Sequence, residues 1–270
     1  MESTEDKTVL ITGATDGLGR RVAHKLAGQG ARVLVHGRDR GRAETVVREI
    51  SGETDSERVR CYLADLSSLA EVRSLAEEVR AEHDRLDVLV NNAGVIMPER
   101  RESNDGIELT FAVNYLSHFL LTRMLLPLLR ESAPARIVNV ASAGQSPIDF
   151  DDVMLERSYE PMRAYGQSKL AMIMDTFSLA GELEDAGVSV NALHPATLMD
   201  TKMVRETFGG AMSSVEEGTD ATVRLATSPE LEGVTGRYFD GKREARASRQ
   251  AYDGEAREKL RRLSEELAGL

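Results

Sequence analysis

Short apolar runs alternate with longer amphipathic stretches along the whole chain. The runs are rich in β-branched residues and stop at Gly, Asn or Asp, which is typical of buried strands, whereas the longer stretches have helical spacing. We expect strands at residues 8–12, 32–36, 58–63, 87–91, 136–141, 188–193 and 235–239. The stretches between and after them predict helices at residues 17–29, 40–50, 68–83, 108–130, 163–186, 215–227 and 254–268.

This alternation predicts one α/β domain over residues 1–270. Strands separated by helices form a parallel sheet that is covered on both faces, so we expect a doubly wound, seven-stranded parallel sheet. A chain of 270 residues is long enough to bury one such core. Ligands of these sheets bind at the carboxyl ends of the strands, and the candidate chemistry should gather there.

The acidic composition narrows the possible partners. A net charge of -11 argues against nucleic acid and anionic membrane, which require a basic face. The most apolar stretch, residues 116–129, is short and contains Arg123 and Pro127, so we interpret it as a core helix and not a membrane span. Residues 1–7 are polar and acidic, which predicts neither a signal peptide nor an anchor.

Cysteine and histidine usage adds two expectations. The single cysteine, Cys61, excludes an internal disulfide and fits a reducing cytoplasm. The five histidines show no ligand spacing, so we predict no metal site.

The first strand leads into a glycine-rich turn and then into a helix, the arrangement that cradles a diphosphate. Gly13 allows a sharp turn, Gly17 removes the Cβ that would block a phosphate, and Gly19 lets the helix pack closely. The helix start offers free N–H groups to an anion. A purely structural turn would show the same glycines. The cofactor contacts predicted in this turn are Gly13, Thr15, Asp16, Gly17, Leu18 and Gly19.

The ends of strands two and three bear on nucleotide preference. An arginine after strand two suits the 2′-phosphate of NADP(H), whereas an acidic residue would bind the free ribose hydroxyl of NAD(H). Arg38 at this place favours NADP(H) and leaves NAD(H) possible, although exposed loop arginines are common. After strand three, Asp65 beside Leu66 could bind the adenine amino group or cap the helix expected from Ser67.

Strand four ends in Asn91-Asn92-Ala93-Gly94, where small residues suit a backbone that passes close to a cofactor. We predict contacts from Asn92, Ala93 and Gly94. Asn and Gly are also ordinary turn formers.

The candidate catalytic residues are Asn114, Ser142, Tyr165 and Lys169. Tyr165 and Lys169 are four residues apart on a predicted helix and share one face, so the ammonium can lower the pKa of the phenol. Tyr165 could then exchange a proton with a carbonyl or alcohol oxygen, to which Ser142 would donate a hydrogen bond. A surface ion pair, and an amide that satisfies a neighbouring carbonyl, are the structural alternatives for these side chains.

In this order, the motifs resemble the short-chain dehydrogenase/reductase family over nearly the whole chain. The resemblance implies a single-domain Rossmann fold with Tyr165 as the general acid/base. It also implies that Lys169 binds the nicotinamide ribose, that Ser142 orients the substrate oxygen and that Asn114 holds a water of the proton relay.

Within the family, the chain is similar to the retinol dehydrogenase and WW-domain oxidoreductase branch. The similarity rests on residues 111–119, the long gap from Ser142 to Tyr165 and residues 235–239. The branch acts on varied lipophilic alcohols and carbonyls, and its frequent N-terminal anchor and its WW module are not found in this sequence.

One departure follows strand six, where the family has Pro-Gly and then a threonine near the nicotinamide carboxamide. Here Ala196 replaces the glycine after Pro195, so the loop path can differ. We predict contacts from Pro195 and Thr197, with Thr201 as the alternative threonine.

Two segments should frame the substrate, residues 143–164 and 197–215. The second carries Met199, Met203, Phe208 and Met212, which would suit a lid over an apolar ligand. The first carries Asp149, Asp151, Asp152 and Glu156, which disfavour an anionic substrate if they face inward.

Helices 108–130 and 163–186 are apolar nearly all round and need a cover beyond the sheet. Similar helices in the family pair across a two-fold axis, so we expect a homodimer or homotetramer; the alternative is a cover within the chain.

Taken together, these residues predict a cytoplasmic NAD(P)-dependent oxidoreductase that acts as a carbonyl reductase or alcohol dehydrogenase on an apolar small molecule. Two alternatives remain open. One is an epimerase or dehydratase of the same fold that retains its nucleotide, and the other is a nucleotide sensor without turnover.

Overall fold

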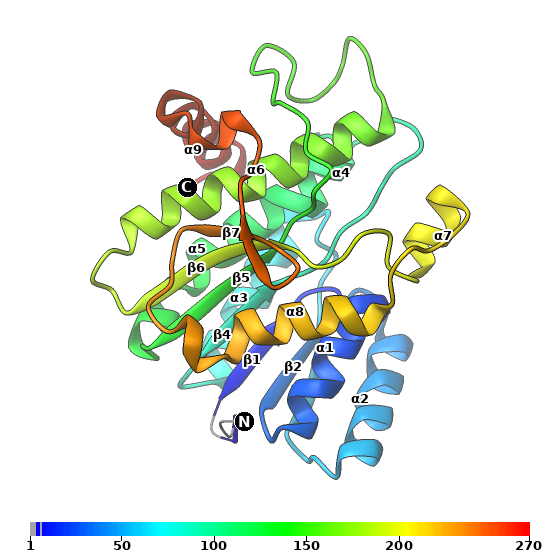
Figure 1. Ribbon diagram of the computed structural model, residues 1–270, viewed down its shortest axis with the longest axis vertical. Coiled ribbons are helices and arrows are strands. Elements are labelled where there is room, and N and C mark those ends of the chain that lie inside the picture. The colour runs from blue at the N-terminus through cyan, green and yellow to red at the C-terminus, as the bar shows by residue number, and fades with distance from the viewer. Residues whose placement is uncertain (1–3, 6) are drawn as a thin grey trace.

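The apolar runs come together as one sheet in the computed structural model, which describes residues 4–5 and 7–270 (Figure 1). The strands are β1 (Thr8–Ile11), β2 (Arg32–Gly37), β3 (Val59–Leu63), β4 (Val88–Asn91), β5 (Ala135–Val140), β6 (Val188–His194), β7 (Arg237–Asp240) and β8 (Arg243–Ala245). The helices are α1 (Gly17–Gly28), α2 (Arg40–Thr54), α3 (Leu69–Glu82), α4 (Leu109–Phe111), α5 (Ser117–Glu131), α6 (Pro161–Glu182), α7 (Lys202–Phe208), α8 (Val215–Thr227) and α9 (Gly254–Ala268). A π turn, η1 (Ala112–Leu116), joins α4 to α5, and η2 (Pro229–Leu231) and η3 (Arg249–Tyr252) are 3-10 turns.

The strand order is β3-β2-β1-β4-β5-β6-β7-β8, with β1 to β7 parallel. The chain moves outward from β1 to β3, returns to β4 beside β1 and then continues in the opposite direction. This reversal at β1 and β4 creates the crevice in which doubly wound folds bind their ligands. The register aligns Ile11 with both Val35 and Val90, so the loops after β1, β2 and β4 start at the same edge.

The seven predicted strands are therefore confirmed as a parallel set, and β8 is an addition. It returns antiparallel to β7 through a tight turn in which Gly241 has φ 56°. Its residues, Arg243 to Ala245, are mostly exposed and show no apolar alternation, so the sequence carried no signal for this strand.

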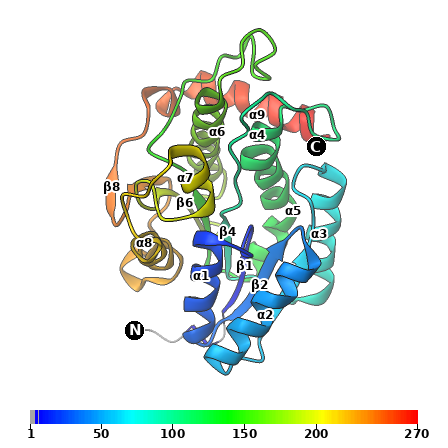
Figure 2. The same ribbon diagram turned by 90° about the vertical axis from the view of Figure 1, so that its right-hand side faces the viewer.

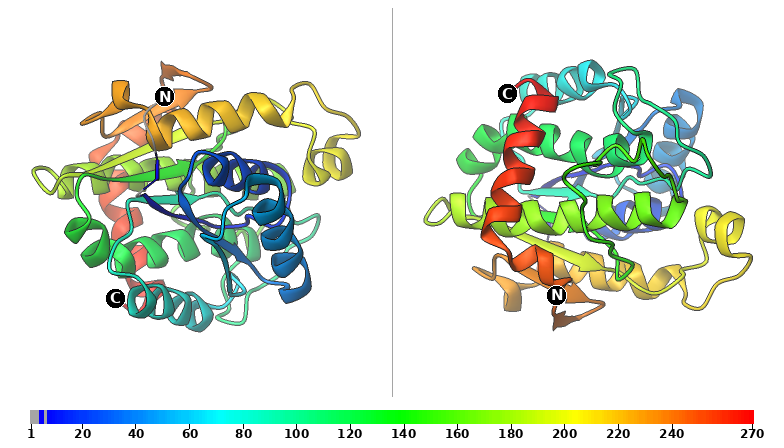
Figure 3. Two further views of the ribbon diagram at one scale, coloured as in Figure 1. Left: turned by 90° about the horizontal axis from the view of Figure 1, so that it is seen from below. Right: turned by 90° about the horizontal axis from the view of Figure 1, so that it is seen from above.

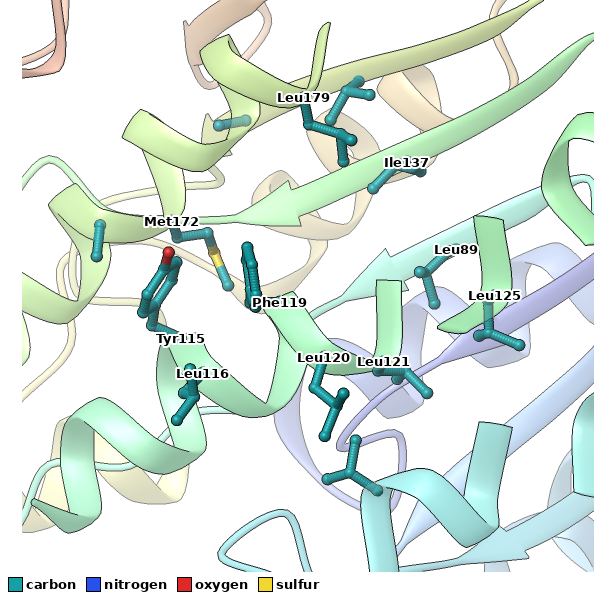
Figure 4. Close-up of a cluster of buried hydrophobic side chains, with 14 of the residues drawn as sticks. Leu89, Tyr115, Leu116, Phe119, Leu120, Leu121, Leu125, Ile137, Met172 and Leu179 are labelled. Carbon is teal, nitrogen blue, oxygen red and sulfur yellow. The ribbon is translucent and has the colours of Figure 1, made fainter. Parts of the chain in front are cut away.

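Successive side chains of the central strands enter two separate cores, one on each face of the sheet. Val9 and Ile11 pack with α1, α2 and α8, whereas Leu10 packs with α3, α5 and α6. Figure 3 shows these two helical layers on opposite sides of the sheet. The second core contains the largest buried side chains of the α5 region, Tyr115 and Phe119, which Figure 4 shows between the sheet and the helices.

The predicted helix over residues 108–130 is continuous but not uniform, because the π turn interrupts it at residues 112–116. Among the described residues, Leu109–Glu131 is the one helix long and apolar enough to cross a membrane by length and composition. Packing inside the protein accounts for this composition, since 78% of its most apolar window is buried.

The C-terminal helix α9 supplies the cover that the apolar helices need. Seen from above, it crosses α6 and α5 and ends near α3 (Figure 3). Leu260 is buried in the same core as α5 and α6, and the hydroxyl groups of Ser264 and Tyr115 form a buried hydrogen bond of 2.7 Å. A cover within the chain is therefore present. It is formed by α9 and by part of the long segment 143–164, since Ile148 and Val153 are buried in the same core.

Candidate active site

The glycine-rich turn after β1 has the close contacts that the glycines were predicted to allow. Gly13 has φ 63°, and a Cβ on it would lie 2.9 Å from the Cα of Ala93. Gly37, at the end of β2, meets the turn from the other side, where a Cβ would lie 2.4 Å from Thr15 Cγ2. The turn is thus held between the ends of β2 and β4.

The start of α1 fits a diphosphate. Gly17 has φ 50°, and Asp16 caps the helix by accepting the N–H of Gly17 at 2.7 Å. The next N–H groups, those of Leu18 and Gly19, have no partner within a helix and remain for an anion. The side chain of Leu18 is buried in the core, so only its backbone faces the turn.

Arg38 stands exposed at the end of β2. Within residues 4–5 and 7–270 it forms no ion pair or hydrogen bond. The neighbouring carboxylate, Asp39, accepts the Arg42 N–H at 2.8 Å and caps α2. The Arg38 guanidinium is therefore free to bind a ligand, whereas the Asp39 carboxylate is already hydrogen-bonded.

Asp65 and Leu66 follow β3. The Asp65 side chain accepts the N–H of Ser67 at 2.9 Å and braces its own turn, while Leu66 is buried in the core. The idea that Asp65 caps a helix from Ser67 is wrong, because α3 begins at Leu69 and its cap is Ser68.

The loop after β4 is fastened to the glycine-rich turn. The N–H groups of Asn92 and Ala93 donate to Thr12 Oγ1 at 2.8 and 3.0 Å, and the Asn92 amide donates to the Thr12 carbonyl at 2.7 Å. A Cβ on Gly94 would lie 3.4 Å from Asn114 Oδ1 and 3.5 Å from Lys169 Nζ. The same loop thus touches both the predicted cofactor turn and the predicted catalytic side chains.

Asn114 lies in the π turn and is fully buried. Its Oδ1 accepts the Val95 N–H at 2.7 Å, and its Nδ2 donates to the Val95 carbonyl and to Ser168 Oγ, both at 3.0 Å. The Asn114 amide therefore does satisfy a neighbouring backbone carbonyl, as the structural alternative proposed. Through these bonds it holds the loop after β4 in place.

Ser142 follows β5, and its side chain lies near Tyr165, where it acts to lower the pKa of the phenol. Its Oγ also accepts the Gly144 N–H at 3.0 Å. The Ser142 carbonyl accepts from the Tyr238 hydroxyl at 3.1 Å and from the Gln145 amide at 3.0 Å. These two bonds fix the backbone from which the serine side chain projects.

Tyr165 and Lys169 share one face of α6, as their spacing predicted. Lys169 Nζ lies 5.7 Å from the centroid of the Tyr165 ring and donates to the Val140 carbonyl at 2.8 Å. Lys169 is only 3% exposed, so Tyr165 and Lys169 are not a pair on the protein surface. The four predicted catalytic residues therefore meet at the carboxyl edge of the sheet.

The expected depression of the Tyr165 pKa is wrong. Burial raises the pKa of this phenol, and the neighbouring Ser142 side chain lowers the pKa only in part. The ammonium of Lys169 is directed to the Val140 carbonyl, and burial lowers its own pKa to about 8. Tyr165 therefore carries its proton at neutral pH. This is the form in which a general acid can protonate a carbonyl oxygen.

The buried lysine gives a testable dependence of stability on pH. The pKa of Lys169 falls from its ordinary 10.5 to about 8, so the unfolded chain binds the extra proton between these values and stability rises with pH. We expect Lys169→Met to lack this rise. Between pH 7.5 and 10 the wild type should gain roughly 2 kcal/mol of unfolding free energy relative to the variant, at about 1.4 kcal/mol per pK unit.

Denaturant titrations of both proteins at the two pH values measure this difference. Lys202→Met, at an exposed lysine of α7, is the matched control and should follow the wild type. Parallel stability curves for Lys169→Met and wild type would contradict the assignment.

The loop after β6 carries a left-handed residue two positions after Ala196. The left-handed residue is Leu198, with φ 46°, and Pro195 is buried near Gly218 of α8. Thr197 is exposed and bonds His194 Nε2 at 3.0 Å. Thr201 is the threonine that approaches the glycine-rich turn, since a Cβ on Gly17 would lie 3.3 Å from its Cγ2.

The two substrate-framing segments differ in packing. Segment 143–164 is held by the rest of the chain, for example through Ile148, whose N–H donates to the Gln250 side chain at 2.7 Å. Segment 197–215 contains α7, which has no buried residue. This helix stands away from the body of the protein at the right of Figure 1 and faces the viewer in Figure 2. Phe208 and Met212 are exposed on this segment, at 44% and 76%.

The carboxylates of segment 143–164 do not gather at the site. Asp149 pairs with Arg163 at 3.4 Å, and Asp152 accepts N–H groups of its own loop, including that of Glu156 at 2.8 Å. In the part of the chain that the structure describes, no group of three or more His, Cys, Asp or Glu residues could hold a metal ion.

Four side chains that support the site were not predicted from the sequence to do so: Thr12, His36, His118 and Tyr238. His36 accepts the Gly13 N–H on Nδ1, so its proton lies on Nε2 and is donated to the Ala64 carbonyl, both at 3.1 Å. Burial lowers the pKa of His36 to about 4, which keeps the ring neutral. The only signal was position, since these residues flank the motifs at strand ends or one helical turn away.

Comparison with known proteins agrees with this geometry. Residues 7–210 match the family model for short chain dehydrogenases. The chain belongs to the short-chain dehydrogenase family. It is 40% identical to retinol dehydrogenase 13 of Mus musculus over 281 residues, which cover 98% of this chain and 84% of that protein. This short-chain dehydrogenase is therefore an NAD(P)-dependent enzyme of the retinol dehydrogenase-like branch.

Solved structures share the fold. A crystal structure of an uncharacterized protein from Mycobacterium paratuberculosis has a TM-score of 0.82 and 30% identity, covering 100% of this chain and 96% of that chain. The RhlG/NADP complex of Pseudomonas aeruginosa has a TM-score of 0.73 and 30% identity, covering 89% and 97%. The predicted Rossmann fold is confirmed.

Proposed function

We propose that this short-chain dehydrogenase prefers NADP(H) and interconverts a carbonyl and an alcohol on an apolar small molecule. The position of Tyr165 beside buried Lys169 carries the proposal, since Lys169 Nζ lies 5.7 Å from the centroid of the Tyr165 ring. This pair places a proton donor near the Ser142 side chain, at the edge of the sheet where the glycine-rich turn lies.

The chemistry divides between these groups. The bound nicotinamide supplies or accepts the hydride. Tyr165 gives its phenolic proton to the substrate oxygen during reduction and takes the alcohol proton during oxidation. Ser142 donates a hydrogen bond to the same oxygen as negative charge develops on it. Lys169 would bind the nicotinamide ribose with its buried ammonium, and Asn114 holds the loop that carries Gly94.

The preference for NADP(H) is supported by Arg38 and Asp39. A free guanidinium is suited to a 2′-phosphate, with which it can form charge-assisted hydrogen bonds. The carboxylate that could instead accept a ribose hydroxyl is already bonded to the Arg42 N–H.

Two features support an apolar substrate. The curated relative acts on retinol by its name, and retinol is an apolar alcohol. The segment predicted to form a lid presents Phe208 and Met212 to solvent, where an apolar ligand would let them be buried.

A cofactor-consumption screen tests the proposal. NADPH and NADH are each offered with all-trans-retinal, long-chain aldehydes, ketones and steroids, and with pyruvate as a small anionic carbonyl. We expect NADPH oxidation with the apolar carbonyls and little with pyruvate. A preference for pyruvate would overturn the substrate class, and product formation without net cofactor oxidation would favour an epimerase or dehydratase.

The cytoplasmic location and the absence of a membrane partner remain proposals, supported by the net charge of -11 and the single cysteine. We also propose that the chain forms a homodimer or homotetramer. Because α9 covers part of the apolar helices within the chain, the contact between copies would use another face. Sedimentation at micromolar concentration measures the mass, and the mass of one chain would contradict the assembly.

A further inference from the structure

His118 connects the two halves of the site. It lies on α5 one turn after Asn114 and is 2% exposed. Its Nδ1 lies 3.0 Å from the Asn114 carbonyl oxygen, and its Nε2 lies 2.9 Å from Thr12 Oγ1. The ring therefore spans from the glycine-rich turn to the π turn.

The partners determine where the ring proton lies. A carbonyl oxygen only accepts, so Nδ1 must carry the hydrogen. Thr12 Oγ1 already accepts the N–H groups of Asn92 and Ala93, so its own hydrogen must be donated. Two acceptors are in reach, His118 Nε2 at 2.9 Å and the Val90 carbonyl at 3.4 Å, and the shorter contact assigns the hydrogen to Nε2. Burial lowers the pKa of His118 to about 3, which agrees with a neutral ring.

These bonds close a ring of contacts around the loop after β4. Thr12 holds the loop at Asn92 and Ala93, Asn114 holds it at Val95, and His118 joins Thr12 to Asn114. All donors in the path from the loop through Thr12 to the Asn114 carbonyl point the same way, an arrangement in which hydrogen bonds polarise one another.

We propose that His118 is a positioning residue that couples the dinucleotide-binding turn to the catalytic Asn114 and Lys169. Its Thr12 bond holds the nucleotide turn, and its Asn114 bond holds the π turn against which Gly94 and Lys169 pack. The catalytic part of this inference rests on the proposed function, whereas the nucleotide-binding part does not.

Two conservative variants separate the two bonds. In His118→Asn the amide can still donate to the Asn114 carbonyl but is too short to reach Thr12. In His118→Gln the longer amide can still accept from Thr12 but leaves the Asn114 carbonyl. Loss of a hydrogen bond has a larger effect when its buried partner is left unpaired, so we expect roughly a tenfold effect from each loss.

The expected result is a split between affinity and turnover. His118→Asn should raise the Kd for NADPH roughly tenfold with kcat nearly unchanged, and His118→Gln should lower kcat roughly tenfold with Kd nearly unchanged. Fluorescence titration gives Kd and steady-state assays give kcat. His83→Gln, at a second buried histidine that contacts Tyr62 away from the site, is the matched control and should change neither.

Each contrary outcome has a defined meaning. Folded variants with unchanged Kd and kcat, or with equal losses of melting temperature and no split, would overturn the coupling. If Tyr165→Phe leaves turnover intact, the redox proposal fails, but the Kd difference between the two His118 variants still decides the binding part. If neither variant folds, nitrogen-15 shifts of the wild-type imidazole decide, because a proton on Nε2 would overturn the proposed path.

Discussion

Replacing Tyr165 with Phe should lower kcat by roughly 10³-fold, within the range that a positioned acid or base contributes. The variant keeps the ring and loses only the hydroxyl, which lies near the Ser142 side chain. The glycine-rich turn is not touched, so the Kd for NADPH should stay within about twofold of the wild-type value. Steady-state assays with the best carbonyl from the screen and fluorescence titration with NADPH provide the two measurements.

Tyr62→Phe is the control for this experiment. Tyr62 lies on β3, and its hydroxyl bonds Glu82 at the end of α3 and His83 directly after it. These residues are outside the site, so loss of the hydroxyl should leave kcat unchanged. A Tyr165→Phe enzyme with unaltered kcat would refute the acid/base role and remove the basis of the proposed function.

Changing Arg38 to Asp should move the ratio of kcat/KM for NADPH over NADH by roughly 10²-fold toward NADH. A hydrogen bond to a charged group is worth about 1.5–3 kcal/mol, which corresponds to roughly 10-fold to 100-fold. The new carboxylate would also repel a 2′-phosphate and could accept the ribose hydroxyl of NADH. Initial rates with each nucleotide at a fixed carbonyl concentration give the ratio.

Arg40→Asp provides the same change of charge two residues further along. Arg40 is exposed and pairs with Glu44 at 3.6 Å, so its replacement should leave the ratio within about twofold. Equal shifts in both variants would show that the overall charge of this surface, and not a direct contact with Arg38, determines the preference for NADPH over NADH.

The sequence was most informative where one local rule dictates one residue type. The glycine positions, the strand runs and the Tyr165/Lys169 spacing each follow from local backbone or helix geometry, and the structure places them as expected. A left-handed φ at Gly13 and Gly17 and a close contact at Gly19 can be inferred from a short segment without knowledge of its partners.

The remainder depends on contacts between distant segments. The bond from His118 to Thr12 joins residues 106 positions apart, and no periodicity signals it. The protonated state of Tyr165 could not be inferred either, because spacing gives the distance to Lys169 but not the burial that opposes ionisation. The π turn within an apolar helix and the strand β8 likewise have no local pattern.

The position of α9 has a consequence for synthesis. The catalytic helix α6 and the helix that carries Asn114 leave the ribosome well before residues 254–268, which cover them. Domains assemble as units during translation, and apolar surface exposed in the meantime favours aggregation. The apolar faces of α5 and α6 therefore remain exposed until residues 254–268 have left the ribosome. A chain that terminates before residue 254 would aggregate even though every active-site residue is present.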